Sequence, residues 1–274
     1  MDSGKRTLTD EERRALQLNE LEILQEFKRV CKANHLEYYL TAGTLLGAVR
    51  HQGFIPWDDD IDVAMPRRDF EKLALLCRSH LKEGFYYQDC RTEKDYPYYF
   101  AKIRREGTEV LEPCLEAFNI RKGQYIDIFP LDGCPSKTIV AVLFFKLMAF
   151  FTAALQGKID PTYPCGYTKL AIRLTYQVFR HFPRSTLKAL RDLTRVLFSS
   201  RAKKKVCTVS GVHGYPAEAF YSDWFTEPVE LTFEGEKFPT PGGWHELLTN
   251  MYGDYMTPPK KADRQGHFIA KEGE

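Results

Sequence analysis

One short stretch decides how this chain folds: Pro56-Trp57-Asp58-Asp59-Asp60-Ile61-Asp62-Val63. Successive side chains of a β-strand point to opposite faces, so a strand here would place Asp58, Asp60 and Asp62 on one face. Ile61 and Val63 would be buried behind them. Neighbouring carboxylates repel one another unless a cation neutralises them, and Mg²⁺ prefers oxygen ligands. An acidic loop beside a strand is the alternative, but it leaves the apolar residues unexplained, and we therefore predict a metal site.

The residues before the acidic stretch add a second element. Tyr38-Tyr39-Leu40 has the composition of a short strand, and residues 42–50 are predicted to run from a glycine turn into a short helix. Gly43 lets backbone N–H groups approach an anion closely, Thr44 adds a hydroxyl, and a helix N-terminus favours phosphate. An ordinary turn and helix cap is the alternative. Because carboxylates follow so closely, we interpret Gly43 and Thr44 as a phosphate cradle that faces a metal site.

The run from Gly43 to Asp62 resembles the signature of the LicD family, whose members transfer phosphocholine and are related to fukutin and fukutin-related protein. The family is similar to the nucleotidyltransferase fold, in which a third acid lies on a later strand. The resemblance continues more weakly at Tyr252 to Met256 and at Arg264 to His267, and it is weakest from about 137 to 206. It implies an α+β fold, with a nucleotidyltransferase-like mixed sheet flanked by helices and a helical insertion.

Two later strands supply further candidates. Asp127 stands among apolar residues in Tyr125 to Phe129, where a carboxylate is costly unless it is paired or metal-bound. A buried salt bridge is the alternative, but the resemblance makes Asp127 the third acid, ahead of Asp132. Lys102 and Arg104 share one face of a predicted strand. They are interpreted as holding the donor phosphates or the leaving group, Lys102 more so than Arg104, with a solvated face as the alternative.

The resemblance implies a Mg²⁺-dependent reaction, with one or two ions and Mn²⁺ as a substitute. Phosphocholine would pass from CDP-choline, or another phospho-alcohol from its CDP derivative, to a hydroxyl of a glycan, with release of CMP. A cell-surface glycan such as lipopolysaccharide or teichoic acid, or its lipid-linked precursor, is the implied acceptor. The expected metal ligands are Asp58, Asp60, Asp62 and Asp127, of which the last three are catalytic, and the expected cofactor-binding residues are Gly43, Thr44, Lys102, Arg104, Arg264 and His267.

Two other functions stay open. A nucleotidyltransferase would leave the nucleotide on the acceptor and release pyrophosphate, and a catalytically silent, membrane-docked binding protein could keep the same fold. The acids at 60 and 62 argue against the silent protein. Aromatic rings can bind a trimethylammonium group by cation–π attraction, although each ring taken singly predicts packing. The candidates nearest to the predicted site are Trp57, Tyr98, Tyr99 and Tyr125.

A chain of 274 residues is long enough for one catalytic domain spanning 1–274 with an insertion. Residues 1–6 are polar and no apolar h-region follows them, so we expect no secretory signal and a cytoplasmic location. The seven cysteines contain no Cys-x-x-Cys pair. This spacing predicts reduced thiols and gives no support to a zinc site.

The segment 137–206 holds 14 Lys and Arg residues and two Asp residues, a net charge of +12 in a chain of net +2. Its apolar run from Ile139 to Phe151 is interrupted by Lys146 and is marginal as a membrane span. A helix at 185–205 combines a leucine stripe with basic residues, a composition typical of helices on anionic membranes. Packing against the core is an equal alternative. Without a nucleic-acid-binding motif we expect no nucleic acid partner.

Hydrophobic periodicity and turn residues predict the remaining elements. We expect helices at 10–33, 67–81, 138–156, 167–181, 185–205 and 243–251, strands at 85–89, 97–104 and 124–129, and a hairpin from Val229 to Phe238 that turns at Glu234-Gly235.

Overall fold

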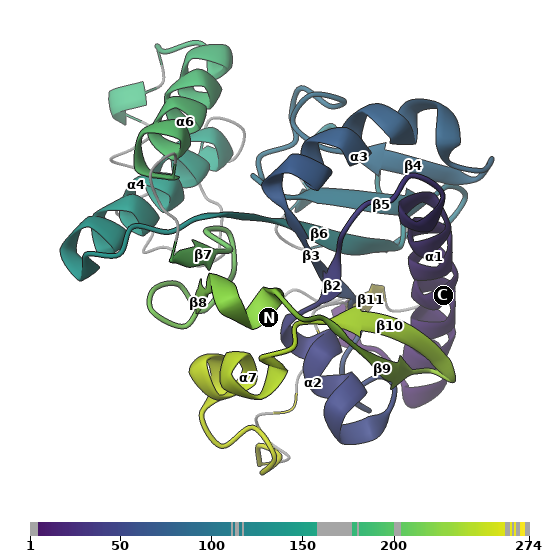
Figure 1. Cartoon of the computed structure of the whole chain (residues 1–274). Helices are drawn as coiled ribbons and strands as arrows, with labels where there is room; N and C mark the ends of the chain where they lie inside the picture. The colour runs from purple at the N-terminus through teal and green to yellow at the C-terminus, as the bar shows by residue number, and fades with distance from the viewer. Residues whose placement is uncertain are drawn as a thin grey trace.

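The computed structural model describes residues 5–110, 112, 115–116, 118–157, 177–179, 181–199, 204–260, 264, 266 and 269–271. Its centre is a mixed sheet with helices packed against it, which confirms the predicted fold class (Figure 1). The helix expected at 167–181 lies mostly outside the described residues. The helices are α1 (Asp10–Ala33), α2 (Ala42–His51), α3 (Arg67–His80), α4 (Thr138–Gly157), α6 (Arg184–Ser199) and α7 (Trp244–Tyr252).

The sheet has seven strands, five of them in the order β2-β3-β6-β5-β4, with β7 and β8 attached at the far end of β6. β3 and β6 are parallel, and the other pairs are antiparallel. The strands of this sheet are β2 (Tyr39–Leu40), β3 (Asp62–Pro66), β4 (Phe85–Gln88), β5 (Ala101–Arg105), β6 (Tyr125–Gly133), β7 (Lys205–Cys207) and β8 (Ala219–Tyr221).

The register of this sheet brings chemically active residues into one row. Asp62 of β3 is the direct partner of Asp127 in β6, and Asp127 is in turn the partner of Lys102 in β5. Directly opposed residues of neighbouring strands project to the same face. The sheet therefore sets two acids and one base side by side across its three central strands.

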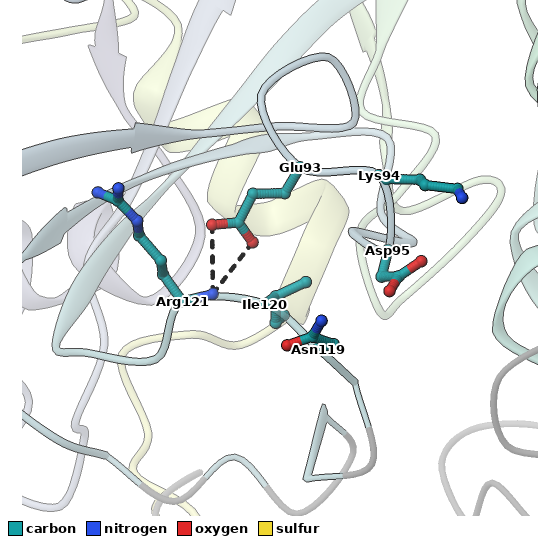
Figure 2. Close-up of a pocket in the computed structure, with 6 residues that line it drawn as sticks. All are labelled: Glu93, Lys94, Asp95, Asn119, Ile120 and Arg121. Carbon is teal, nitrogen blue, oxygen red and sulfur yellow. Dashed lines mark hydrogen bonds between the residues drawn. The ribbon is translucent and has the colours of Figure 1, made fainter.

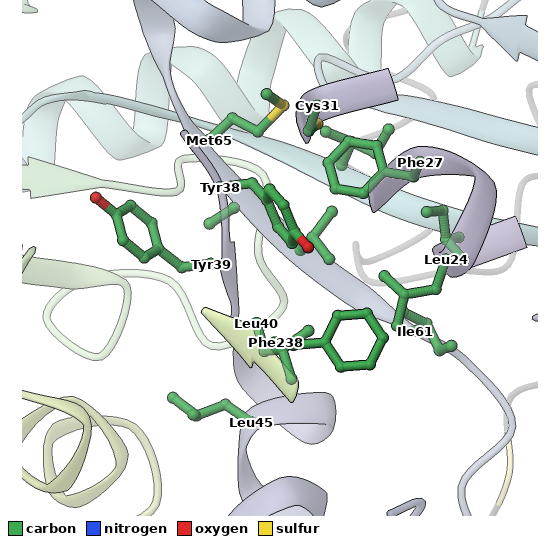
Figure 3. Packing of buried hydrophobic residues seen from close by; sticks show 14 of the residues in the cluster. Leu24, Phe27, Cys31, Tyr38, Tyr39, Leu40, Leu45, Ile61, Met65 and Phe238 are labelled. Carbon is green, nitrogen blue, oxygen red and sulfur yellow. The ribbon is translucent and has the colours of Figure 1, made fainter. Parts of the chain in front are cut away.

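Helix α1 covers this sheet and forms the main core. It begins at a capping box, in which the Thr9 hydroxyl accepts the Glu12 N–H and the Glu12 carboxylate accepts the Thr9 N–H. Further along, Leu24 and Phe27 are fully buried. Figure 3 shows Leu24 beside Ile61, the apolar residue between two of the acids. The acidic stretch is therefore anchored in the core through Ile61.

The helical pair α4 and α6 extends away from the main core beyond the end of β6 (Figure 1). The rings of Phe144 and Phe198 stack at 5.4 Å between centroids and join the two helices. Among the residues that the structure describes, α4 alone is long and apolar enough to cross a membrane, and 39% of that stretch is buried inside the protein. Lys205 already belongs to β7, so the helix end predicted at 205 was wrong.

The face of α6 that is buried differs from the one that its leucine stripe suggested. Leu187 and Arg191 are both buried, and Arg191 donates to the Pro97 carbonyl at 3.3 Å. Leu193 and Leu197 are 52% and 66% exposed. The apolar stripe is therefore largely on the surface, while part of the basic set points inward because backbone carbonyls accept its N–H groups.

The C-terminal part closes over α2. The predicted hairpin is confirmed as β9 (Val229–Phe233) and β10 (Glu236–Thr240), with left-handed φ values of 49° at Glu234 and 79° at Gly235. A further pair, β1 (Lys5–Thr7) with β11 (Ile269–Lys271), joins the two ends of the chain. Sequence patterns did not predict this pair because three-residue strands carry too few positions for a periodicity.

Candidate active site

The acidic stretch enters the sheet only at its last carboxylate. β3 begins at Asp62, and a turn closed by the Asp58 N–H on the Ile55 carbonyl at 2.9 Å precedes it. The expectation that one strand carries all the alternating acids was therefore wrong, because the chain leaves this turn in an irregular segment. Burial alternates nonetheless, since Asp59 is 1% exposed whereas Asp58, Asp60 and Asp62 are half-buried.

The carboxylates act on one another electrostatically. Burial first, and then the charge of Asp60, raises the pKa of both Asp58 and Asp62 well above the ordinary value. Asp127 acts on Asp62 in the same direction. Carboxylates raise one another's pKa in this way when they lie close together. We call Asp58, Asp60, Asp62 and Asp127 the carboxylate cluster.

Gly43 and Thr44 lie in the first turn of α2, beside this cluster. A Cβ on Gly43 would come within 2.7 Å of Asp58 Oδ2, so glycine is required for that carboxylate to approach the helix start. The Thr44 hydroxyl accepts the Asp62 N–H at 2.8 Å and fixes the beginning of β3. In this structure the two residues position carboxylates, and their contact with phosphate stays a prediction.

Asp127 is placed in β6 opposite a lysine. Lys102 Nζ lies 2.9 Å from Asp127 Oδ1 and 3.3 Å from a Glu112 oxygen. Burial raises the pKa of Asp127 to about 6, although the positive charge of Lys102 acts in the opposite direction. Asp132 instead accepts two hydrogen bonds from Arg67, at 2.8 and 2.6 Å. The geometry therefore favours Asp127 over Asp132 as the third acid.

Arg104 is enclosed by protein groups. Its guanidinium donates to Gln88, to the Gly123 carbonyl and to Glu112 at 2.6, 2.6 and 2.7 Å, and the residue is 2% exposed. It shares a partner with Lys102, since Glu112 contacts both cations. With its donors directed to these groups, Arg104 supports the fold of β5, and we assign it no part in donor binding.

Two residues near the C-terminus, Arg264 and Gly266, lie against the acidic turn. The Arg264 guanidinium lies 4.4 Å from the centroid of the Trp57 ring. A Cβ on Gly266 would come within 2.2 Å of the Asp59 carboxylate, so the backbone passes directly against that side chain. This places Arg264 beside Trp57 at the acidic turn, while His267 lies outside the described residues.

Sequence reasoning missed two residues next to the cluster. Arg50 lies 5.7 Å from the centroid of the Trp57 ring and donates to the Tyr255 carbonyl at 2.9 Å. Glu20 of α1 is fully buried. A helical pattern hides both, because Arg50 ends an amphipathic helix and Glu20 interrupts an apolar stripe. For Glu20 the available sequence signal was an acidic residue within an apolar stripe.

The other aromatic candidates are packed into the protein. Lys102 lies over the ring of Tyr125, Tyr98 stacks on Phe100 at 4.9 Å between centroids, and the Tyr99 hydroxyl accepts a hydrogen bond from Arg67. Trp57 differs, because it precedes Asp58 directly and stands at the edge of the carboxylate cluster.

A hollow of about 580 Å³ lies elsewhere, between two loops (Figure 2). Across it the Glu93 carboxylate accepts the Arg121 N–H at 3.2 and 3.1 Å. No member of the carboxylate cluster lines this hollow, so we do not assign it to the active site. Its lining residues are Glu93, Lys94, Asp95, Asn119, Ile120 and Arg121.

The carboxylate cluster fits a hard cation by its chemistry. Among the described residues, no three His, Cys, Asp or Glu side chains stand in the arrangement of a ready-made metal site. The cluster nonetheless offers carboxylate oxygens that raise one another's pKa, and such ligands are the ones that Mg²⁺ takes. Side-chain rotation would be needed to gather these oxygens around one ion.

Acids on paired parallel strands, next to a Gly-Thr helix start, agree with the nucleotidyltransferase-like fold that the sequence resemblance implies. The family model described as LicD/FKTN/FKRP, nucleotidyltransferase domain, matches residues 35–136, which include the whole cluster. The chain is also 29% identical over 273 residues to the lipopolysaccharide cholinephosphotransferase LicD of Haemophilus influenzae, with 93% of this chain and 96% of that protein covered. The chain is therefore similar to LicD proteins over most of its length, and the domain model of that family matches residues 35–136.

Two shorter matches lie in rickettsial proteins. An uncharacterized protein of Rickettsia typhi is 43% identical over 58 residues, which cover 21% of this chain and 18% of that protein. One of Rickettsia prowazekii is 39% identical over 71 residues, which cover 23% of this chain and 26% of that protein. These matches concern only a fraction of each chain and carry no functional information.

Proposed function

We propose that this protein transfers phosphocholine from CDP-choline to a hydroxyl of a cell-surface glycan or of its lipid-linked precursor, and releases CMP. The similarity to a relative named as a lipopolysaccharide cholinephosphotransferase supports this, because it covers 93% of the chain. The structural observation that carries the proposal is the direct pairing of Asp62 with Asp127 in β3 and β6. This pairing concentrates negative charge where a diphosphate and its cation can bind.

The transfer forms a bond between the acceptor oxygen and the phosphorus that bears choline, and breaks the bond from that phosphorus to the CMP oxygen. The carboxylate cluster would hold Mg²⁺, or Mn²⁺ in its place, which neutralises charge on the phosphates. Asp127 is suited to accept the proton of the acceptor hydroxyl, because its pKa of about 6 lies near neutral pH. Lys102 pairs with Oδ1 of this carboxylate, so Oδ2 would serve both the cation and the proton.

The donor diphosphate would lie beside two arginines of the site, Arg50 and Arg264. Arg50 and Arg264 both contact the Trp57 ring, and Asp58 acts electrostatically on Arg50. After burial, the charge of Arg264 is the largest influence that lowers the pKa of Arg50. Two guanidinium groups held close together repel each other, and a diphosphate relieves that repulsion by binding both.

Attachment to the cytoplasmic face of a membrane would bring this site to a lipid-linked acceptor. Helix α6, with its exposed leucines, packs against α4, where Ile139 and Leu143 are 84% and 49% exposed. The surrounding segment 137–206 carries a net charge of +12. Apolar and basic groups together are what reversible attachment to anionic lipid requires.

The decisive experiment incubates the purified protein with Mg²⁺ and a panel of CDP-alcohols, and measures CMP release by chromatography. Slow hydrolysis of the preferred donor is expected without an acceptor, because water replaces the glycan hydroxyl. The variant Asp62→Asn should release no CMP, whereas Asp192→Asn, at an exposed acid of α6, should behave as wild type. Pyrophosphate release from nucleoside triphosphates, with no CMP from any CDP-alcohol, would identify a nucleotidyltransferase instead.

A further inference from the structure

Glu20 is an unusual residue for the position that it occupies. It is 0% exposed on α1, and within the described part of the chain neither of its carboxylate oxygens has a hydrogen-bond partner. Glu26, two turns further along the same helix, is also buried, but it accepts two hydrogen bonds from Arg29, at 2.8 and 2.6 Å. A buried carboxylate without a partner is costly, so the position of Glu20 calls for a ligand.

The contacts of α1 show which way Glu20 faces. Residues three and four positions apart lie on one side of a helix. Gln17, three residues earlier, donates to the Asp58 carbonyl at 2.8 Å, and Leu16, four residues earlier, packs with Tyr125. Leu24, four residues later, lies beside Ile61 (Figure 3). Glu20 therefore stands between contacts to the acidic stretch and contacts to the start of β6.

Electrostatics agree with this placement. Burial first, and then the charges of Asp60, Asp59, Asp58 and Asp127, raises the pKa of Glu20 well above its ordinary value. Asp58 and Asp60 of the carboxylate cluster thus act on Glu20 from the acidic stretch, together with their neighbour Asp59, and Asp127 acts from β6. The side chain lies within reach of both halves of the site.

We propose that Glu20 is a fifth carboxylate of the active site, which binds the divalent cation from the α1 side and completes the oxygen set of the carboxylate cluster. This rests on the proposed function, which requires a cation at that cluster. Mg²⁺ takes six oxygen ligands, and the four acids come from the sheet and from the segment that leads into it. A carboxylate from α1, the helix that covers this sheet, would add a ligand from a separate element.

The test measures cation binding directly, by calorimetry with Mn²⁺ in the full chain. Glu20→Gln keeps the size of the side chain and removes its charge, and it should weaken Mn²⁺ binding at least tenfold. Glu20→Met, a second variant without polar atoms, should do the same. Both should also unfold at the same temperature as wild type or higher without metal, because they remove an unpartnered buried charge. The rise in melting temperature that Mn²⁺ produces should shrink in both.

Glu26→Gln is the matched control, because it also removes one buried carboxylate from α1. It should lower the melting temperature through loss of the Arg29 pair and leave Mn²⁺ affinity unchanged. Wild-type Mn²⁺ affinity in both Glu20 variants, or no Mn²⁺ binding by the wild type, would overturn the inference. CMP release by the wild type is scored separately. A protein that releases CMP while Glu20→Gln binds Mn²⁺ normally keeps the proposed function and loses only this inference.

Discussion

Asp62 of β3 and Asp127 of β6 are directly paired residues of two parallel strands. The Asp127 N–H donates to the Ile61 carbonyl at 2.8 Å, which fixes the two carboxylates side by side. Asp127 has Lys102 as a partner, but the pKa of Asp62 is raised well above its ordinary value by burial and by the charges of Asp60 and Asp127. The fold thus holds acids together at a cost in stability, and a bound cation would offset this cost.

The first prediction concerns Asp60→Asn and Asp62→Asn. Each change removes an expected ligand and relieves repulsion within the carboxylate cluster. CMP release should fall below detection, while the melting temperature without metal should stay the same or rise. Turnover assays and thermal unfolding of the same preparations check this. Near-wild-type turnover of either variant at saturating Mg²⁺ would rule out the assigned site.

The second prediction separates chemistry from donor binding at Asp127. Asp127→Ala should lower turnover by at least a hundredfold, in the range of general acid–base contributions. The affinity for CDP-choline should change far less, because Arg50 and Arg264 provide the diphosphate contacts in our proposal. Single-turnover kinetics and calorimetry report these two quantities independently. Lost donor affinity combined with normal turnover at saturation would contradict the role given to Asp127.

The local parts of this site could be predicted from sequence. The alternation of acids with Ile61 and Val63 predicts a buried strand that carries carboxylates, and the apolar run around Asp127 predicts a second such strand. Their direct pairing is a property of sheet order and register, which short-range patterns do not contain. Glu20 was hidden for a related reason, because only the packing of α1 on the sheet shows that its carboxyl faces the other acids.

For Arg104 the sequence predicted the position but not the partner. Strand alternation correctly placed Arg104 on one face with Lys102, but phosphate was expected as its partner. Alternation specifies a face and not what covers that face. Here the face is covered by Glu112, which lies in a loop without a periodic pattern. An inserted loop of this kind leaves no signal near residue 104 in the sequence.

The third prediction contrasts two arginines. Arg104→Met should destabilise the protein by about 3–5 kcal/mol, because it leaves Glu112 buried with one cation fewer. Arg50→Gln should change stability by less than about 1 kcal/mol and raise the KM for CDP-choline by roughly tenfold or more through loss of a charged hydrogen bond. Denaturant unfolding and steady-state kinetics test the pair. Equal effects of the two changes on KM would place Arg104 in the donor site after all.

The fourth prediction concerns pH and Glu218. Burial raises the pKa of Glu218 to about 7, although hydrogen bonds from Thr208 and the His213 N–H act in the other direction. The ordinary pKa is 4.5. Between pH 4.5 and about 7 the folded state therefore keeps a proton that the unfolded chain has lost. The stability that this proton contributes is complete below the lower value and is lost as pH rises through the higher one.

Glu218→Gln cannot ionise and should remove this loss. Between pH 4.5 and 8 the variant should become more stable relative to the wild type, by roughly 3–3.5 kcal/mol in free energy of unfolding at about 1.4 kcal/mol per pKa unit. Urea unfolding at four pH values measures the difference. Curves that run parallel across this range would show that Glu218 titrates as an ordinary carboxyl.

The last prediction tests attachment through the exposed stripe of α6. Leu193 and Leu197 are one helical turn apart and largely exposed, so Leu193→Ser with Leu197→Ser should change stability by only about 1 kcal/mol. The same change removes apolar surface that would enter the lipid interface, where each CH₂ contributes about 0.8 kcal/mol. Binding to anionic liposomes should therefore weaken at least about tenfold, the factor that about 1.4 kcal/mol represents.

Leu75→Ser is the matched control, because Leu75 is 67% exposed on α3, away from this helical pair. It should sediment with liposomes as the wild type does. Neutralising Arg201, Lys203, Lys204 and Lys205 to Gln should weaken binding at low salt and matter less at high salt; the first two of these residues lie outside the described part of the chain. CMP release in solution should be unaffected by every one of these changes. If the wild type does not sediment with anionic liposomes at low salt, the stripe serves a protein contact or the binding of the acceptor, and membrane attachment has to be abandoned.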